Sequence, residues 1–447
     1  MTRTTLRSAT VKLALAVLCW SGASVSFGQF FANRSVGGVA VDAQGVLEAP
    51  TVEDNAELLA LRDQVQLDTP ADLEQFTERR AVSLKRLEAT IARCRAENKP
   101  LPAEVECLAG LQRVQYVFVY PEQQDIVLVG PAEGWKVDDL GNVVGRTTNR
   151  PVLMLDDLLV ALRSGGSSRM DPITCSIDPT PEGLRRLQEL TSRLENIGDP
   201  DETLAMIEDA LGPQVISVTG VPTTSHFARA MVAADFRMKR IAMNFEPAPI
   251  DGLPSFLSMI PGNGRGANNM MPRWWLAPNY EPLAKTADGL GWELRGPGVQ
   301  CMTEEEFLNA SGEKQSTGKA GTIAAKWAGS LTDKFAELAD HDSSFGQLRN
   351  LMDLAVIGAL IEKEQLASTA GLKAPWLMGQ EELDRYPTPT RTSSKASVIR
   401  KRGAWVISAS GGVEIVPWQI ADRIETVADV SDARPEVGAD ATNFWVE

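Results

Sequence analysis

The sequence predicts an α+β fold that consists of two mixed α/β units, a buried helical hairpin and a C-terminal β-hairpin. Short runs of β-branched and aromatic residues, typical of strands, recur between longer stretches whose apolar residues have helical spacing. In the second unit, the order strand, helices, strand, helix indicates a sheet covered by helices. Of the 447 residues, 43% are hydrophobic and 23% are charged, as in soluble globular proteins. This composition excludes collagen-like, coiled-coil and wholly disordered chains.

Residues 69–168 are predicted to form the first α+β domain, after an N-terminal lead-in over residues 29–68. A helix is expected to begin at Thr69, because threonine is a good N-cap residue and the proline that follows suits the first helical position. Two β-rich runs, residues 114–120 and 126–129, flank a short polar segment. This arrangement predicts a β-hairpin.

Residues 169–310 are predicted to form the second α+β domain. It begins with a strand around Cys175, continues through two short helices, and contains a buried strand over residues 214–221. A long helix is expected from about Ser225 to Met243, because its apolar residues fall on one face when they are placed at helical spacing.

Residues 311–385 are predicted to form a helical hairpin that packs on the second domain. Its second arm, residues 345–365, contains a stretch that is apolar on nearly every side, as in a helix buried inside a protein. That stretch is interrupted by Asp353 and is shorter than the roughly 20 apolar residues that a membrane span needs. We therefore expect this arm to belong to the protein core.

The C-terminal part of the chain is predicted to begin with a linker over residues 386–396, which is rich in proline, threonine and serine. A β-hairpin is expected over residues 397–421, because two β-rich runs flank an Ala-Ser-Gly-Gly segment. The last stretch, residues 422–447, is acidic and poor in large apolar residues, so we expect a mobile tail.

Residues 1–28 have the three-part form of a secretory signal peptide. A basic segment precedes a short apolar core at residues 13–18, and small residues then lead to a suitable cleavage position before Gln29. The apolar core is too short to remain as a membrane-spanning helix. The sequence therefore predicts a protein that is secreted or periplasmic and has no transmembrane segment after signal cleavage.

Four cysteines lie beyond the predicted signal peptide: Cys94, Cys107, Cys175 and Cys301. An even number in an oxidising compartment favours disulfide bonds, and four cysteines allow three pairings. We prefer Cys94–Cys107, which flank a turn, and Cys175–Cys301, which lie in two strand-like segments. The alternative is four buried free thiols. No metal site is expected, because the chain has no CxxC motif and only two histidines.

The first candidate binding site is an anion site on the helix that starts at Ser225. His226, Arg229, Arg237 and Arg240 share one sector of this helix, beside its apolar face. Together with the free N–H groups at the helix N-terminus, they could hold a carboxylate, sulfate or phosphate group. The alternative is that the arginines pair with the protein's own acidic residues.

The second candidate binding site is the loop over residues 261–275, which contains Arg265, Trp274 and Trp275. Alternating glycines would let the backbone approach a ligand, and the tryptophans could stack on a sugar ring or a peptide. The alternative is a surface loop whose tryptophans anchor the following strand. The glycines lack the strand and helix that a dinucleotide site requires.

Catalytic signatures are scarce, so we are uncertain about enzymatic activity and lean against it. The sequence has no phosphate-binding P-loop, no HExxH zinc motif and no GxSxG nucleophile motif. The net charge of −15 argues against nucleic acid as a partner. No catalytic residue and no cofactor is predicted. A hydrolase with a carboxylate pair is the alternative, because the two acids of such a site can lie far apart in the sequence.

Three segments together resemble a family of secreted planctomycete proteins that carry a domain of unknown function. They are residues 171–183, residues 220–226 running into residues 237–241, and residues 348–354. The likeness covers roughly residues 116–418 and implies export and a shared fold, without an established activity. We expect a non-catalytic binding or structural component of the periplasm or cell envelope, whose partner is an envelope component or an anionic ligand.

Overall fold

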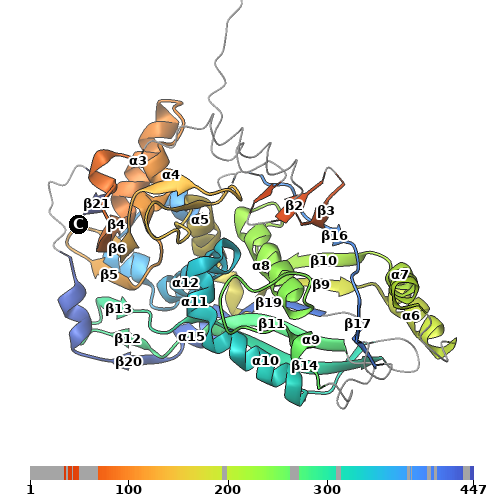
Figure 1. The fold of residues 1–447 in the computed structure, drawn as a ribbon. Helices are drawn as coiled ribbons and strands as arrows, with labels where there is room; N and C mark the ends of the chain where they lie inside the picture. The colour runs from red at the N-terminus through yellow and green to blue at the C-terminus, as the bar shows by residue number, and fades with distance from the viewer. Residues whose placement is uncertain are drawn as a thin grey trace, which may run out of the picture.

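The computed structural model describes residues 35–36, 39–42, 44–49, 69–193, 199–261, 271–308, 314–379, 383, 385–399, 404–406, 410–435 and 443–446. Within these ranges the chain forms two large sheets and a set of helices, which confirms the α+β class. Figure 1 shows α12 (Ser343–Lys363) near the centre of the molecule, with one sheet on each side of it. The predicted signal peptide and Arg265 lie outside the described residues.

The larger sheet is mixed, and its centre is formed by β9, β19 and β11. From edge to edge its strands are β1 (Ser35–Val36), β2 (Val39–Val41), β3 (Val46–Glu48), β16 (Arg391–Thr392), β10 (Gln214–Thr219), β9 (Ile173–Pro179), β19 (Ser410–Ile415), β11 (Met271–Asn279), β14 (Gly298–Leu308) and β15 (Lys314–Ser316). Buried and half-buried residues alternate along β9, which is typical of a sheet with one face packed on the core. The helix α8 (His226–Ala242) packs against β9 and β19 on that face.

The smaller sheet contains the predicted hairpin of residues 114–129, which the structure confirms. Its strands, in spatial order, are β20 (Ile424–Thr426), β12 (Leu283–Lys285), β13 (Gly291–Glu293), β5 (Tyr116–Tyr120), β6 (Asp125–Ala132), β4 (Thr77–Ser83) and β21 (Trp445–Val446). The strands β12 and β13 come from the stretch expected in the second domain, yet they extend the sheet of the first. Two small ribbons pair β7 (Trp135–Val137) with β8 (Val143–Gly145), and β17 (Ser397–Ile399) with β18 (Ala404–Val406).

The helices surround and separate the sheets. Besides α8 and α12 they are α3 (Leu84–Ala96), α4 (Ala103–Glu106), α5 (Leu155–Ser164), α6 (Pro181–Arg193), α7 (Pro200–Leu211), α9 (Phe256–Met259), α10 (Thr322–Asp333), α11 (Phe335–His341), α13 (Leu366–Ala370), α14 (Pro375–Met378) and α15 (Pro417–Ala421). Short 3₁₀ turns occupy Ala71–Leu73, Leu108–Gly110, Ser167–Arg169 and Asp429–Ala433.

The core prediction for the second arm of the helical hairpin is confirmed. Every residue of α12 from Ser344 to Ile361 is buried. The helix contacts α5, α8, α11 and α15, so its apolar residues meet protein on all sides. Among the helices of the described residues, none combines the length and the apolar character that crossing a membrane would require.

The expected helix start at Thr69 is wrong. Residues Ala71–Leu73 form a 3₁₀ turn, and the chain then enters β4, which pairs with β6. The helix α3 begins only at Leu84, where the Ser83 hydroxyl accepts a hydrogen bond from the N–H of Arg86. Local capping signals were overridden here by pairing with a strand that lies about 50 residues further along the chain.

The C-terminal strands also differ from the prediction. β18 pairs with β17, whereas β19 lies between β9 and β11 in the middle of the larger sheet instead of forming a hairpin with β18. Gly411 and Gly412 were interpreted as turn residues, but both lie within β19. A Cβ atom on Gly411 would overlap the carbonyl oxygen of Trp274, and one on Gly412 would overlap that of Cys175. The glycines are therefore needed for close strand packing.

Part of the predicted acidic tail is ordered. β20 pairs with β12 and β21 pairs with β4, so residues from the last stretch of the chain extend both ends of the smaller sheet. Low apolar content was a poor guide here, because backbone hydrogen bonds to an existing sheet edge do not depend on large side chains.

The disulfide prediction is corrected by the structure, in which Cys94, Cys107, Cys175 and Cys301 are all free and buried. Cys175 of β9 lies opposite Val413 of β19. On the far side of β19, Val413 lies opposite Leu276 of β11, and Leu276 lies opposite Cys301 of β14. Cys175 and Cys301 are thus three strand spacings apart, about 14 Å, whereas the Cα atoms of a disulfide lie within about 7 Å. Burial raises the pKa of the Cys107, Cys175 and Cys301 thiols, so these three are protonated.

Candidate functional site

The helix α8 carries the residues of the predicted anion site and forms as expected. Ser225 is its N-cap, with its hydroxyl accepting a hydrogen bond from the N–H of Ala228 and donating one to the carbonyl of Pro222. These bonds satisfy a helix end that would otherwise leave N–H groups without partners.

His226 is directed into the protein from the first turn of α8. Its side chain is 4% exposed, and its Nδ1 lies 2.9 Å from Oδ2 of Asp157, which belongs to α5. The ring of Tyr386 packs edge-on against it at 5.6 Å. Burial alone would lower the pKa of His226, but the charge of Asp157 and its hydrogen bond to the ring outweigh burial and raise that pKa. The N-terminal end of α8 therefore holds a buried ion pair between His226 and Asp157.

The His226–Asp157 pair predicts a pH-dependent stability. Because the pKa of His226 is higher in the folded than in the unfolded protein, the pair stabilises the fold fully below about pH 6.5, and this contribution is lost as the pH rises through the folded pKa. We expect Asp157→Asn to lower the free energy of unfolding most at pH 5.5–6.5 and progressively less toward pH 9. Urea unfolding across this range measures it.

The control for this pH series is His341→Gln, because His341 is exposed and, among the described residues, its ring bonds only the carbonyl of Glu337. This variant keeps the His226–Asp157 pair intact and should keep the pH dependence that this pair produces. A loss of stability in Asp157→Asn that is equal at every pH would show that Asp157 does not raise the pKa of His226 in the folded protein.

The three arginines of the predicted anion site have different surroundings. Arg229 is 1% exposed, and burial lowers its pKa to about 10. Arg237 pairs with Glu246 and, at 3.1 Å, with Asp342. Arg240 also pairs with Glu246, and its guanidinium lies 5.4 Å from the ring centre of Phe236. The structure thus gives Arg237 and Arg240 acidic partners within the protein, as the alternative interpretation predicted.

The C-terminal half of α8 forms one wall of a cavity of about 360 Å³, which we call the α8 cavity. Residues of the strands β3 and β16 also line it. Its apolar lining comes from Leu47, Ile177, Phe236, Met243 and Phe245, and its charged lining comes from Glu48, Lys239, Arg240 and Lys395. Gln214, Thr392 and Ser393 add polar groups. Such a mixture of an apolar body and a few charged groups is typical of small-molecule sites.

A buried ion pair fixes the base of the α8 cavity. The Nζ of Lys239 donates hydrogen bonds to Oδ2 of Asp235 at 2.8 Å, to the carbonyl of Ile177 at 3.0 Å and to that of Gly411 at 3.2 Å. Burial raises the pKa of Asp235, although the charge of Lys239 opposes this. All three donors of Lys239 are used, so this lysine joins α8 to β9 and β19, and Arg240 and Lys395 are the other cationic side chains in the described lining of the cavity.

The two tryptophans of the predicted loop site have different surroundings. Trp274 is fully buried and packs against Phe256 and Trp327 with ring centres 4.9 and 4.8 Å apart, so it anchors β11 in the core. Trp275, on the opposite face of the same strand, is half-buried and lines a second cavity. Alternation along one strand separates the two rings.

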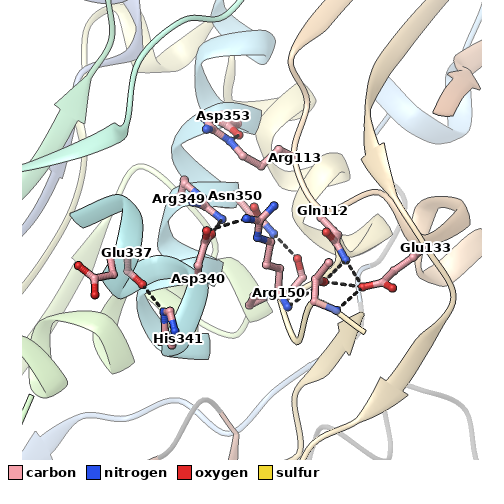
Figure 2. Close-up of polar contacts among 12 residues, drawn as sticks. Gln112, Arg113, Glu133, Arg150, Glu337, Asp340, His341, Arg349, Asn350 and Asp353 are labelled. Atoms are coloured by element: carbon pink, nitrogen blue, oxygen red, sulfur yellow. Dashed lines mark hydrogen bonds and ion pairs between the residues drawn. The ribbon is translucent and has the colours of Figure 1, made fainter. Parts of the chain in front are cut away.

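A third group of polar residues, which we call the α12 polar cluster, was largely missed by sequence reasoning. It consists of Arg113, Arg150, Tyr280, Asp340, Arg349 and Asp353. Figure 2 shows Asp353 beside Arg113 and Asp340 beside Arg349. Asp353 accepts hydrogen bonds from Arg113 at 2.8 Å and from the Tyr280 hydroxyl at 2.6 Å.

Each charged side chain of the α12 polar cluster has a partner of opposite charge inside it, and Asp340 is shared by two arginines. Asp340 accepts from Arg150 at 2.7 Å and from Arg349 at 2.9 Å. Burial lowers the pKa of Arg113, but the attraction of Asp353 outweighs this and raises it. Asp353 interrupts an apolar helix, and this was the available sequence signal. Its partners come from distant segments that no local pattern connects. Because each charged side chain is paired inside the protein, the cluster has a structural role.

In the described part of the chain, no three histidine, cysteine, aspartate or glutamate residues lie close enough together to hold a metal ion. The described lining of each of the two cavities includes a single carboxylate, Glu48 in the α8 cavity and Glu414 in the second.

The comparisons identify one domain. Residues 175–256 match a family described as "Protein of unknown function (DUF1598)". The matched segment begins in β9 and ends at the first residue of α9, so it contains the whole of α8 and the α8-cavity residues of β9, β10 and α8. The searches among curated proteins and among solved structures each returned no match.

Proposed function

We propose that this protein is exported and acts as a non-catalytic binding component of the periplasm or cell envelope. Its ligand is a small molecule with an apolar body and one anionic group, held in the α8 cavity. The observation that carries the proposal is that the described lining of this cavity holds Arg240 and Lys395, besides the paired Lys239 and the acidic Glu48, in a chain whose net charge is −15.

Export is supported by the sequence of residues 1–28 and by the resemblance to secreted proteins. The basic segment, the short apolar core and the small residues before Gln29 together match what signal peptidases process. Free buried thiols are compatible with this location, because the geometry of the larger sheet separates Cys175 from Cys301.

The lining of the α8 cavity supports the choice of ligand. Phe236, Met243 and Phe245 offer apolar surface, and Arg240 and Lys395 bring positive charge to it. Arg240 and Lys395 are held by Glu246 and by Glu208, respectively, neither of which lines the cavity. An anionic group inside would meet a positive surface whose cations are already oriented.

The alternative of a hydrolase with a carboxylate pair has less support. Glycosidases flank the scissile bond with two carboxyl groups about 5–9.5 Å apart. Of the residues that the structure describes, Glu48 is the one carboxylate that lines the α8 cavity, so this cavity favours binding over hydrolysis of that type.

The proposal is tested on the full chain expressed in a bacterial host. We expect the periplasmic protein to begin at Gln29 by N-terminal sequencing. Octanoate and 1-naphthalenesulfonate should bind it in calorimetric titrations, whereas neutral octanamide should bind at least about tenfold more weakly. Arg240→Gln should weaken octanoate binding about tenfold, the effect of one charge-assisted hydrogen bond.

Two further variants sharpen the binding experiment. Glu48→Gln removes the acidic side chain of the cavity and should tighten octanoate binding. Lys326→Gln removes a charge from the exposed face of α10 and should leave it unchanged. Equal affinity for octanoate and octanamide, or equal affinity of Arg240→Gln and the unmodified protein, would contradict the anion site. A protein that retains Met1 would contradict export alone.

A further inference from the structure

We propose that the second cavity, on the outer face of the larger sheet, binds a neutral saccharide. This cavity has a volume of about 210 Å³ and is lined by residues of β19, β11, β14 and α15. It is independent of the α8 cavity, with which it shares no lining residue.

The strand register explains why a hollow exists at this place. Gln300 of β14 lies opposite Ala277 of β11. On the other side of β11, Val413 of β19 lies opposite Leu276, and this register places Glu414 next to Ala277. The small Ala277 leaves space between two longer side chains. Glu414 and Gln300 are two strand spacings apart, about 10 Å at the backbone. A single ring can lie between them with polar groups on both sides.

The next row of the same face supplies an aromatic wall. Trp275 lies opposite Met302, and its other neighbour is Gly412, which has no side chain to cover it. The Arg273 guanidinium lies 4.9 Å from the Trp275 ring centre, and Arg273 is in turn paired with Glu304. These contacts hold the indole in place. A flat apolar ring beside a polar hollow is suited to the C–H face of a pyranose.

The polar groups of the cavity match hydroxyl groups better than charges. The Glu414 carboxylate has no ion-pair or hydrogen-bond partner among the residues that the structure describes. One N–H of the Gln300 amide donates to the carbonyl of Pro278 at 3.0 Å, which leaves its other N–H and its oxygen available. Gln419, exposed on α15, contributes a second amide. A carboxylate and two amides can accept from and donate to vicinal hydroxyls.

Two observations argue against a charged ligand in the second cavity. Among the described residues, the lining contains a carboxylate and no cationic side chain, so an anion would be repelled. A cation that stacked on Trp275 would lie near the Arg273 guanidinium, which is already over this ring. A neutral ligand rich in hydroxyl groups avoids both conflicts.

The outer face continues beyond the cavity with hydroxyl side chains. Glu414 lies opposite Thr174, and Thr174 lies opposite Thr219, with their hydroxyl oxygens 2.8 Å apart. Ser176 and Ser217 form the neighbouring pair. This row extends the site across β9 and β10, so a chain of sugars fits better than a monosaccharide.

The test uses the full exported chain and neutral hexasaccharides as probes: cellohexaose, maltohexaose and chitohexaose. We expect at least one of them to bind in calorimetric titrations, more tightly than its monosaccharide. Trp275→Ala should weaken this binding at least about tenfold. Trp376→Ala removes another half-buried tryptophan, in α14, and should leave it unchanged.

Substitutions of Glu414 separate a hydroxyl ligand from a charged one. Glu414→Gln keeps a hydrogen-bonding group and should bind the hexasaccharide within about threefold of the unmodified protein, whereas Glu414→Ala should lose about tenfold. Circular dichroism checks that each variant is folded. Failure of all three hexasaccharides to bind, or binding that Trp275→Ala leaves intact, would overturn the proposal. Binding of choline that Glu414→Gln abolishes would overturn it too. None of these outcomes bears on octanoate binding in the α8 cavity.

Discussion

Replacing Asp353 with alanine is expected to lower the free energy of unfolding by about 3–5 kcal/mol. The Asp353 side chain is fully buried and accepts two hydrogen bonds from Arg113 and one from Tyr280. Without Asp353, the guanidinium of Arg113 keeps its charge in a mostly buried position and loses its main partner. Urea unfolding followed by circular dichroism measures the change.

A double variant distinguishes an uncompensated charge from lost packing. Arg113→Met combined with Asp353→Leu removes both charges and should recover part of the stability that Asp353→Ala loses, because apolar pairs often replace buried ion pairs without loss. Asp333→Ala, at the exposed end of α10, is the matched control and should change unfolding by less than about 0.5 kcal/mol. A double variant that is less stable than Asp353→Ala would contradict this explanation.

Replacing Gly411 with alanine is expected to cost at least about 4 kcal/mol, enough to prevent stable folding of a marginal protein. Gly411 has a φ of 125°, which L-residues avoid, and an added Cβ would overlap the backbone of Trp274 in β11. That backbone belongs to the centre of the larger sheet and cannot move without breaking the pairing of β19 with β11. The measurement is the yield of folded protein and its urea midpoint.

The control for Gly411 is a glycine in open surroundings. Gly329 lies in α10, and a Cβ there would meet nothing within 4 Å. Gly329→Ala should therefore stabilise the protein by about 0.5–1 kcal/mol through helix propensity. Equal effects at the two positions would show that close packing of β19 is not what requires glycine at 411.

The success of sequence reasoning depended on how local each signal was. The helix α8 and the β5–β6 hairpin were predicted because capping, spacing and turn residues act within a few positions. The strand β4 was missed because its pairing with β6 is remote from the capping signals at Thr69. Gly411 and Gly412 were assigned to a turn because glycine is favoured both in flexible turns and where the backbones of two strands approach closely.

The candidate sites show the same limit. Sequence reasoning singled out Arg240 and Trp275, and each lines a cavity. It grouped them with Ser225 and Trp274, which the structure places elsewhere. Glu414 and Gln300 were not identified, because the neighbours that give them meaning lie on separate strands of one sheet. Helical and strand periodicity assigns a residue to a face, but strand order decides which faces meet.

The position of β19 in the chain has a consequence for how the protein is made. Residues 410–415 fill the middle of a sheet whose other described strands precede them, so the sheet cannot be completed until these residues have left the ribosome. Folds that depend on such remote pairings form slowly. The larger sheet is therefore completed late in synthesis, when β19 can pair with β9 and β11.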